Sequence, residues 1–68
     1  MNTHIMLNGR SHPVTGPLPL AELLDSLGLA NKPVVVEIDG AAILPRDHPS
    51  TTVQPDARVE IVMLAAGG

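Results

Sequence analysis

Arg58-Val59-Glu60-Ile61-Val62-Met63-Leu64 is the stretch from which the rest of the chain is best understood, and Ala65-Ala66-Gly67-Gly68 follows it directly. Residues 58–64 are the most continuously apolar part of the chain and predict one strand. Side chains alternate between the two faces of a strand. This puts one set toward the core and the other toward solvent: Val59, Ile61 and Met63 inward; Glu60, Val62 and Leu64 outward. We expect this strand to lie centrally in a sheet, beside the first strand.

The last four residues, 65–68, are small, apolar and uncharged apart from the terminal carboxylate. Gly67 and Gly68 lack a Cβ, so their backbone can pass through narrow openings. Four extended residues reach roughly 13 Å. An α-carboxyl has a pKa of about 3.5, so it is ionised at neutral pH and is a poor electrophile until it is activated, for example as an adenylate. Such an arm suits delivery into another protein's active site; a frayed terminus without a role is the alternative.

Composition excludes several classes of function. A chain of 68 residues forms one domain, and a domain of this size buries only about 60% of its unfolded surface. No cysteine is present, which excludes disulfides, thiol nucleophiles and cysteine metal sites. With no membrane-length apolar run and no signal peptide, we expect a cytoplasmic protein and no membrane partner. A net charge of -3 and the absence of aromatic residues argue against nucleic acid as a partner.

Two hairpins are predicted from their turn dipeptides, because both residues of Asn-Gly and Asp-Gly tolerate positive φ. In the first, a strand at 4–7 leads through Asn8-Gly9 to a returning strand at 10–14. In the second, the strand Val34–Ile38 leads through Asp39-Gly40 to a returning strand at 41–44. In the second hairpin we expect Val34, Val36 and Ile38 to face inward and Glu37 outward.

One helix of about ten residues is predicted between the hairpins, after a connection at 15–19. Pro19 can occupy its first position, where a missing N–H costs nothing. Gly28 is the expected stop, with Leu29 folding back on Leu24 in a Schellman motif. The helix has one apolar face with the i, i+3, i+4, i+7 spacing, formed by Leu20, Leu23, Leu24 and Leu27.

The stretch 45–50 contains two prolines and reads as irregular, 51–53 as a short edge segment, and 54–57 as a turn. The simplest arrangement is an α+β fold, in which one amphipathic helix packs across a mixed sheet of four or five strands. We expect a single domain over residues 1–64, followed by a flexible Gly-Gly tail at 65–68.

The order of elements and the C-terminal Gly-Gly resemble the ubiquitin-like β-grasp fold and, more closely, the ThiS family of sulfur carrier proteins. No single motif is specific, but together their order and spacing are, and they cover essentially the whole chain. The residues that carry the resemblance are Ile5–Gly9 (IMLNG), Ala21–Leu24 (AELL), Leu27-Gly28-Leu29, Val36–Gly40 (VEIDG), Pro45-Arg46, Arg58–Val62 (RVEIV) and Gly67-Gly68. Two departures are Pro19, where the family often has a Ser or Thr cap, and a tail without an aromatic residue.

The resemblance implies a carrier rather than an enzyme, acting in the formation of the thiazole moiety of thiamin. A ThiF-like adenylating enzyme uses ATP and Mg to adenylate the terminal glycine, here Gly68. A sulfur donor system converts the adenylate to a thiocarboxylate, which is the sulfur source for thiazole synthase, ThiG. The carrier itself binds no cofactor. With no cysteine in the chain, the C-terminus is the obvious place to hold a transferable sulfur.

The candidate site is therefore the carboxylate of Gly68. The residues expected to contact partners are Gly67, Ala66, Ala65, Leu64, Val62 and Met6. The last three are expected to form an exposed apolar cluster near the tail. His4, His12 and His48 have no metal-ligand spacing, so we expect surface histidines and no metal site. Glu22 and Asp25 suit a solvated helix face.

Three other functions remain open. The small subunit of molybdopterin synthase shares the fold and the Gly-Gly end, although that family usually has a longer chain. A protein modifier would attach Gly68 to lysines, and isopeptide adducts would identify it. A small binding domain with incidental glycines would keep its function after deletion of Gly68.

Overall fold

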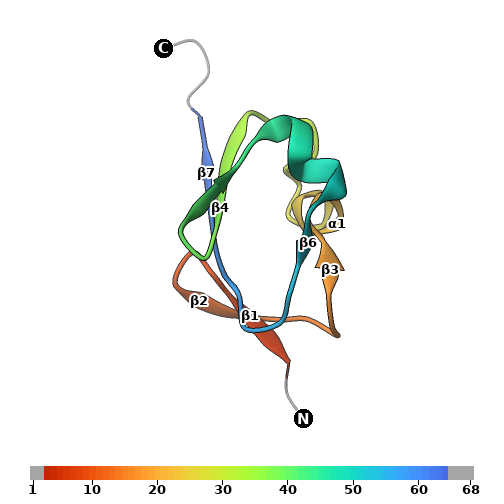
Figure 1. The fold of residues 1–68 in the computed structure, drawn as a ribbon, viewed down its shortest axis with the longest axis vertical. Helices are drawn as coiled ribbons and strands as arrows, with labels where there is room; N and C mark the ends of the chain where they lie inside the picture. Colours follow the sequence, from red (N-terminus) through yellow and green to blue (C-terminus); the bar gives the residue numbers. More distant parts are fainter. Residues whose placement is uncertain (1–2, 65–68) are drawn as a thin grey trace.

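The stretch at the end of the chain forms the centre of the sheet. The computed structural model describes residues 3–64. Strand β7 (Arg58–Met63) lies between β1 (His4–Leu7), to which it is parallel, and β4 (Val34–Ile38), to which it is antiparallel (Figure 1). The hairpin partners β2 (Arg10–Pro13) and β5 (Ala41–Ile43) complete a five-stranded sheet in the order β2-β1-β7-β4-β5. The predicted central position of the last strand, beside the first, is confirmed.

Both hairpins turn through two residues with positive φ. Asn8 and Gly9 have φ of 51° and 81°, and Asp39 and Gly40 have φ of 50° and 85°. Positive φ at both central residues defines the type I′ turn, whose twist matches that of the flanking strands. The two predicted turns are confirmed, although each returning strand ends one residue earlier than predicted, at Pro13 and Ile43.

Asn8 also continues the pairing of β1 with β7 beyond the end of β1. Its backbone N–H donates to the carbonyl oxygen of Val59 at 2.9 Å. Its side-chain Oδ1 accepts the N–H of Ile61 at 2.8 Å, and its Nδ2 donates to the Ile61 carbonyl at 3.2 Å. One side-chain amide therefore satisfies both backbone groups of Ile61 where a strand residue would otherwise be needed.

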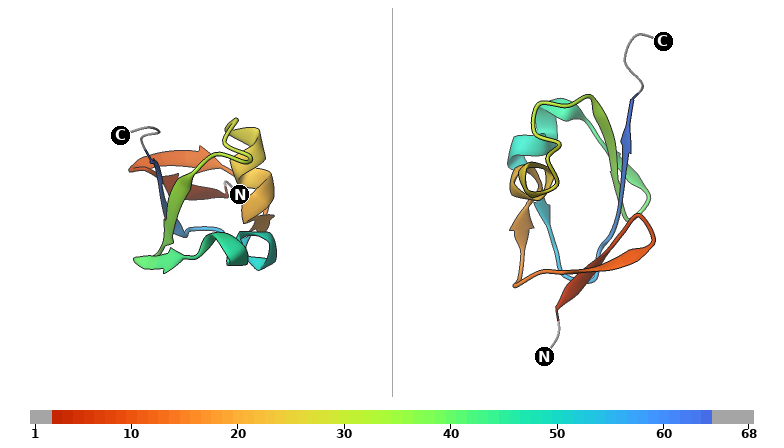
Figure 2. Two further views of the ribbon diagram at one scale, coloured as in Figure 1. Left: turned by 90° about the horizontal axis from the view of Figure 1, so that it is seen from above. Right: turned by 180° about the vertical axis from the view of Figure 1, so that it is seen from behind.

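Helix α1 (Leu20–Ser26) packs on one side of the curved sheet (Figure 2). Leu20, Leu23 and Leu24 are buried, as their spacing predicts. The prediction was wrong for Leu27, which is 36% exposed. Leu27 is the C-cap of a helix of only seven residues, so no further helical turn covers it.

The two ends of α1 differ in how well they follow the predictions. At the C-terminal end, Leu29 N–H donates to Leu24 at 2.8 Å and Gly28 N–H donates to Asp25 at 3.0 Å. These bonds and the φ of 74° at Gly28 form the predicted Schellman motif. At the start, Pro19 is the N-cap and not the first helical residue. Its ψ of 134° is extended because Pro19 belongs to a strand.

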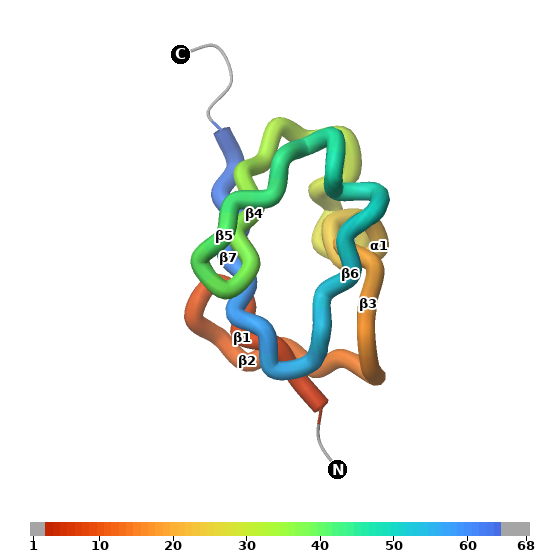
Figure 3. The backbone as a smooth tube through the Cα atoms, in the orientation of Figure 1, coloured from red at the N-terminus to blue at the C-terminus, as the bar shows by residue number. Residues whose placement is uncertain are grey.

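Two segments predicted to be irregular or connecting have regular structure. The prolines of 45–50 do not prevent a 3₁₀ helix, η1 (Pro45–Ser50), since Pro45 stands at its start, where its N–H is not needed. The connection before α1 contains a strand, β3 (Leu18–Pro19), which pairs antiparallel with β6 (Thr52–Val53) beside the helix (Figure 3). This pairing is between residues distant in sequence, which a local pattern does not reveal.

The core lies between α1 and the inner face of the sheet, and it is built from aliphatic side chains. Met63 was predicted to belong to it and does not, because it is 51% exposed. Leu7, the last residue of β1, pairs with Val59, so Met63 extends past the end of β1. The largest fully buried side chains are Ile5, Leu20, Leu23, Val36, Val53 and Val59. A five-stranded mixed sheet wrapped around one main helix is the ubiquitin-like β-grasp fold, the α+β class that the sequence predicts.

The double role of Asn8 can be tested by replacing it with glycine, which keeps the positive φ and removes the side-chain amide. We expect Asn8→Gly to lower the free energy of unfolding by about 1–3 kcal/mol, because two partly buried hydrogen bonds worth about 1 kcal/mol each are lost. The measurement is equilibrium unfolding in urea.

Asn31→Gly is the matched control for Asn8→Gly. Asn31 also has positive φ, 64°, and its side chain makes no hydrogen bond within residues 3–64. Its replacement should change stability by less than about 1 kcal/mol, since only the freedom of the unfolded chain changes. Equal losses for the two variants would contradict a role for the Asn8 amide.

Candidate functional site

The candidate site begins at the end of β7. Gly68, Gly67, Ala66 and Ala65, predicted to carry the chemistry and to contact partners, lie outside the described residues, as does the predicted flexibility of the tail. Leu64 is the last described residue, and its N–H donates to the carbonyl of Pro33 at 2.8 Å. The start of the tail is thus fixed to the segment that enters β4.

Four exposed apolar side chains lie beside the start of the tail, on the sheet face opposite α1. Val62 on β7 pairs with Val35 on β4. Leu44 follows β5 directly, and the register in which Val36 pairs with Ile43 brings it beside Val35. Val62, Val35, Leu44 and Leu64 are between 41% and 60% exposed. We call these four residues the outer strip.

Met6 does not join the outer strip, so the predicted cluster of Met6, Val62 and Leu64 is only partly formed. Met6 points to the same face, but it pairs with Arg58, at the opposite end of β7 from Val62. Four residues of extended strand separate these positions by roughly 13 Å. Val62 and Leu64 are exposed next to the tail, as expected, whereas Met6 is half-buried.

Two carboxylates border the outer strip. Glu37 on β4 and Glu60 on β7 are direct cross-strand partners, and both are exposed. Within residues 3–64 neither side chain forms an ion pair. Arg58, two residues before Glu60, uses its backbone N–H to donate to Asp39 Oδ1 at 2.9 Å. The outward-facing residues of β7 toward the tail are Arg58, Glu60 and Val62, so the outer face changes from charged to apolar in that direction.

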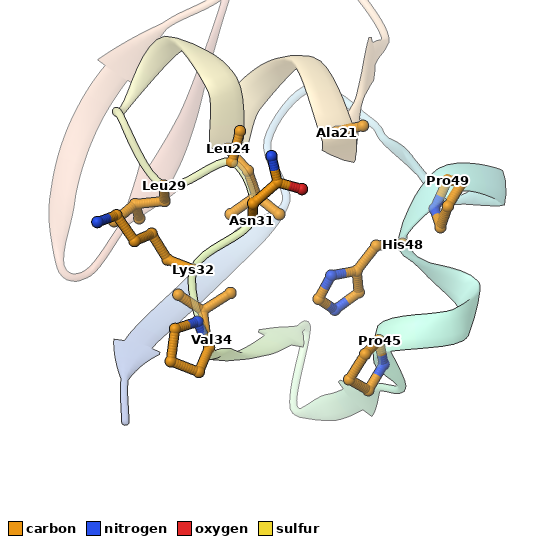
Figure 4. A pocket seen from close by; sticks show the side chains of 11 residues that line it. Ala21, Leu24, Leu29, Asn31, Lys32, Val34, Pro45, His48 and Pro49 are labelled. Carbon is orange, nitrogen blue, oxygen red and sulfur yellow. The ribbon is translucent and has the colours of Figure 1, made fainter. Parts of the chain in front are cut away.

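A hollow of about 560 Å³ lies between α1, η1 and the segment before β4. Figure 4 shows the imidazole of His48 and the ring of Pro45 on one side of it, with Lys32 and Val34 on the other. His48 Nε2 is 3.2 Å from the carbonyl oxygen of Ile43. His48 is half-buried and not the solvated surface residue that the sequence suggests.

Few polar side chains surround this hollow. It is lined by the imidazole of His48, the ammonium group of Lys32 and the amide of Asn31, and by no carboxylate, hydroxyl or thiol. Among residues 3–64 no three His, Cys, Asp or Glu side chains gather as metal ligands. His4 lies 4.0 Å from Asp56 at the far end of the sheet. In the same part of the chain, no helix has the length and apolar character needed to cross a membrane.

Comparison with known proteins adds to this geometry. A profile described as the ThiS family matches residues 5–68. The chain belongs to the ThiS family. A crystal structure of the thiamine biosynthesis protein ThiS from Geobacter metallireducens is 32% identical in sequence to this ThiS family member, with a TM-score of 0.79 and 100% of each chain covered. None of the curated proteins matches the chain.

Sequence reasoning identified two of the four residues of the outer strip in this ThiS family member. Val35 could also have been predicted, because alternation along β4 places it on the same face as Glu37. Leu44 could not have been predicted, since its position depends on the pairing register of β4 with β5. The acidic pair likewise follows from the register of β4 with β7 and from no local motif.

Val59 and Val62 offer a test of the two faces of β7, because the same substitution is made in one strand. Val59 is fully buried, and Val59→Ala should lower the free energy of unfolding by about 2–3 kcal/mol through lost burial and a cavity. Val62 is 60% exposed, and Val62→Ala should change the free energy of unfolding by less than about 1 kcal/mol. Urea unfolding of both variants gives the comparison, and similar losses would show that Val62 is part of the core.

Proposed function

We propose that this chain is a sulfur carrier in thiamin biosynthesis and not itself an enzyme. The observation that carries the proposal is the ThiS family match from residue 5 to Gly68. The β-grasp sheet supports it, because its last strand leads directly to the exposed residue Leu64. The thiamine biosynthesis protein from Geobacter metallireducens has the same fold over its whole length.

The chemistry proposed for the carrier takes place at the carboxylate of Gly68. A ThiF-like adenylating enzyme, using ATP and Mg, joins this carboxylate to AMP and releases pyrophosphate, so that AMP becomes the leaving group. A sulfur donor system then replaces AMP with sulfur and leaves a thiocarboxylate. The thiocarboxylate passes its sulfur to thiazole synthase, ThiG, for the thiazole moiety of thiamin.

The described part of the chain supports this sequence of events through its geometry. The hydrogen bond between Leu64 and Pro33 fixes the start of the tail. The four residues that follow can extend by roughly 13 Å. A rigid domain with a short arm places the carboxylate within the active site of one enzyme and then of another, while the domain itself stays outside.

Intact mass is the direct test of this proposal. We expect incubation with the ThiF-like adenylating enzyme of the same organism, Mg-ATP and a sulfur donor to raise the mass by the difference between one sulfur and one oxygen. A chain that lacks Gly68 should show no gain, because the terminal carboxylate no longer has its proper position. Leu27→Ala, at the end of α1, should gain mass as the natural chain does, because it leaves the carboxylate of Gly68 intact.

Two other results would identify a different function. An unchanged mass with an enzyme that is active on another carrier would contradict the sulfur carrier proposal. Isopeptide adducts between Gly68 and lysines would indicate a protein modifier. Assembly with a molybdopterin synthase large subunit, with sulfur transfer to its substrate, would indicate the molybdopterin pathway.

A further inference from the structure

The side-chain amide of Asn8 holds the end of β1 against β7 through both of its polar atoms. Oδ1 accepts the N–H of Ile61 at 2.8 Å, and Nδ2 donates to the Ile61 carbonyl at 3.2 Å. An amide combines an acceptor and a donor in one planar group, whereas both oxygens of a carboxylate only accept. This contact therefore depends on the nitrogen atom Nδ2.

Gly9, the next residue, makes the Asn8 amide chemically reactive. The backbone nitrogen that follows an asparagine can attack the side-chain carbonyl carbon, Cγ, and glycine hinders this attack least because it lacks a Cβ. The new N–Cγ bond closes a succinimide ring, the Cγ–Nδ2 bond breaks, and Nδ2 leaves as ammonia with the proton of the Gly9 nitrogen. One water then opens the ring at either carbonyl and gives aspartate or isoaspartate. Asn8 and Gly9 are both exposed, so water reaches the turn.

The closed sheet opposes this reaction. The two hydrogen bonds to Ile61 hold the carboxamide against β7, and the backbone N–H of Asn8 donates to the Val59 carbonyl at 2.9 Å. Cγ can turn toward the Gly9 nitrogen only after the bonds to Ile61 break. The reaction therefore requires the turn end of the β1–β2 hairpin to separate from β7.

This separation is a local event. The register of β1 with β7 covers two residue pairs, whereas that of β4 with β7 covers five. Leu7, at the end of β1, is only half-buried, so this end can leave β7 without exposing the fully buried Ile5. Openings that break few contacts require less free energy than global unfolding.

We propose that Asn8-Gly9 is a deamidation site that the pairing of β1 with β7 controls. In the closed sheet the hydrogen bonds to Ile61 keep Cγ and Nδ2 from reacting, and each opening of the turn end releases them. The substrate is the side-chain amide of the chain itself, the attacking group is the Gly9 nitrogen, and the co-reactant is water. This inference does not depend on the carrier function proposed above.

The product cannot restore the original contact with β7. Aspartate places an acceptor oxygen where Nδ2 donated, so the Ile61 carbonyl loses the Asn8 donor and faces a negative charge. Isoaspartate routes the main chain through Cγ, which adds one backbone atom to the turn before Gly9. Because the ammonia is lost to solvent, the end of β1 stays weakened once the reaction has occurred.

Site-resolved mass spectrometry of the natural chain tests the proposal. Samples are kept for equal times in mildly alkaline buffer, with and without enough guanidinium chloride to unfold the chain, and are then digested. In the unfolded chain Asn8 should gain the mass difference between a hydroxyl and an amino group, and in the folded chain this gain should be at least about tenfold slower. Asn31 is the control within the chain, because it also has positive φ but is followed by Lys32, so it should change little in either sample.

Two variants of β7 test whether the sheet sets the rate. Val59→Ala should speed the modification of Asn8 in the folded chain by at least about fivefold, because Val59 is fully buried and pairs with Leu7 at the end of β1. Val62→Ala makes the same change at an exposed position of the same strand and should leave the rate as it is in the natural chain.

Asn8→Asp measures the consequence of the modification directly. Its melting temperature should be roughly 4–8 °C below that of the natural chain, because the donor to Ile61 is replaced by a charged acceptor. Asn31→Asp introduces the same charge at a side chain without a hydrogen bond in residues 3–64, and its melting temperature should change by less than about 2 °C.

Four results would overturn the proposal. Equal rates at Asn8 in the folded and unfolded chains, or in Val59→Ala and Val62→Ala, would show that the sheet does not control the reaction. No change at Asn8 in the unfolded chain, over a time in which an unstructured Asn-Gly peptide is converted, would show that the site is unreactive. An Asn8→Asp chain that melts with the natural chain would show that the contact with Ile61 does not depend on Nδ2.

Discussion

The pairing of β7 on both of its edges is the constraint on which the rest of the molecule depends. Because β7 is held between β1 and β4, the last strand lies in the middle of the sheet and not at its edge. Its inward side chains, Val59 and Ile61, are then buried beneath α1. A domain of this size has little apolar surface to bury, so a central strand that contributes to the core along most of its length stabilises it efficiently.

The same strand carries core residues on one face and exposed residues on the other. As far as Ile61, residues of β7 alternate between the core and the outer face, so buried and exposed positions follow each other in one short sequence. The pairing of β7 with β1 ends where Asn8 binds Ile61. Beyond that point only β4 pairs with β7. The outer strip and Leu64, where the tail starts, thus lie at the same end of the sheet.

Much of the fold could be predicted because the local signals agree with the tertiary structure. The hairpin turns form at the two dipeptides that predict them, Asn8-Gly9 and Asp39-Gly40. The helix has the buried face that the leucine spacing predicts, and it ends before Gly28. The pairing of β3 with β6 was missed, since each strand has only two residues and its partner is distant in sequence. Met63 was misplaced for a related reason: its exposure depends on where β1 stops.

The candidate site was predictable to a smaller extent. The terminal glycines follow from the sequence alone, whereas the acidic pair and the place of Leu44 depend on strand register. Met6 shows the limit of alternation, which gives the face on which a residue lies but not its position along the neighbouring strand. Residue pattern therefore gives the face on which a residue lies, whereas the make-up of the surface depends on strand register.

Pro33 gives the tail a defined starting point. At its pairing with Leu64, an ordinary residue would accept one hydrogen bond and return another, but proline has no N–H to return. The pairing of β4 with β7 therefore lacks one hydrogen bond just before β4 begins. Leu64, the last described residue, is held at this position by its own N–H alone.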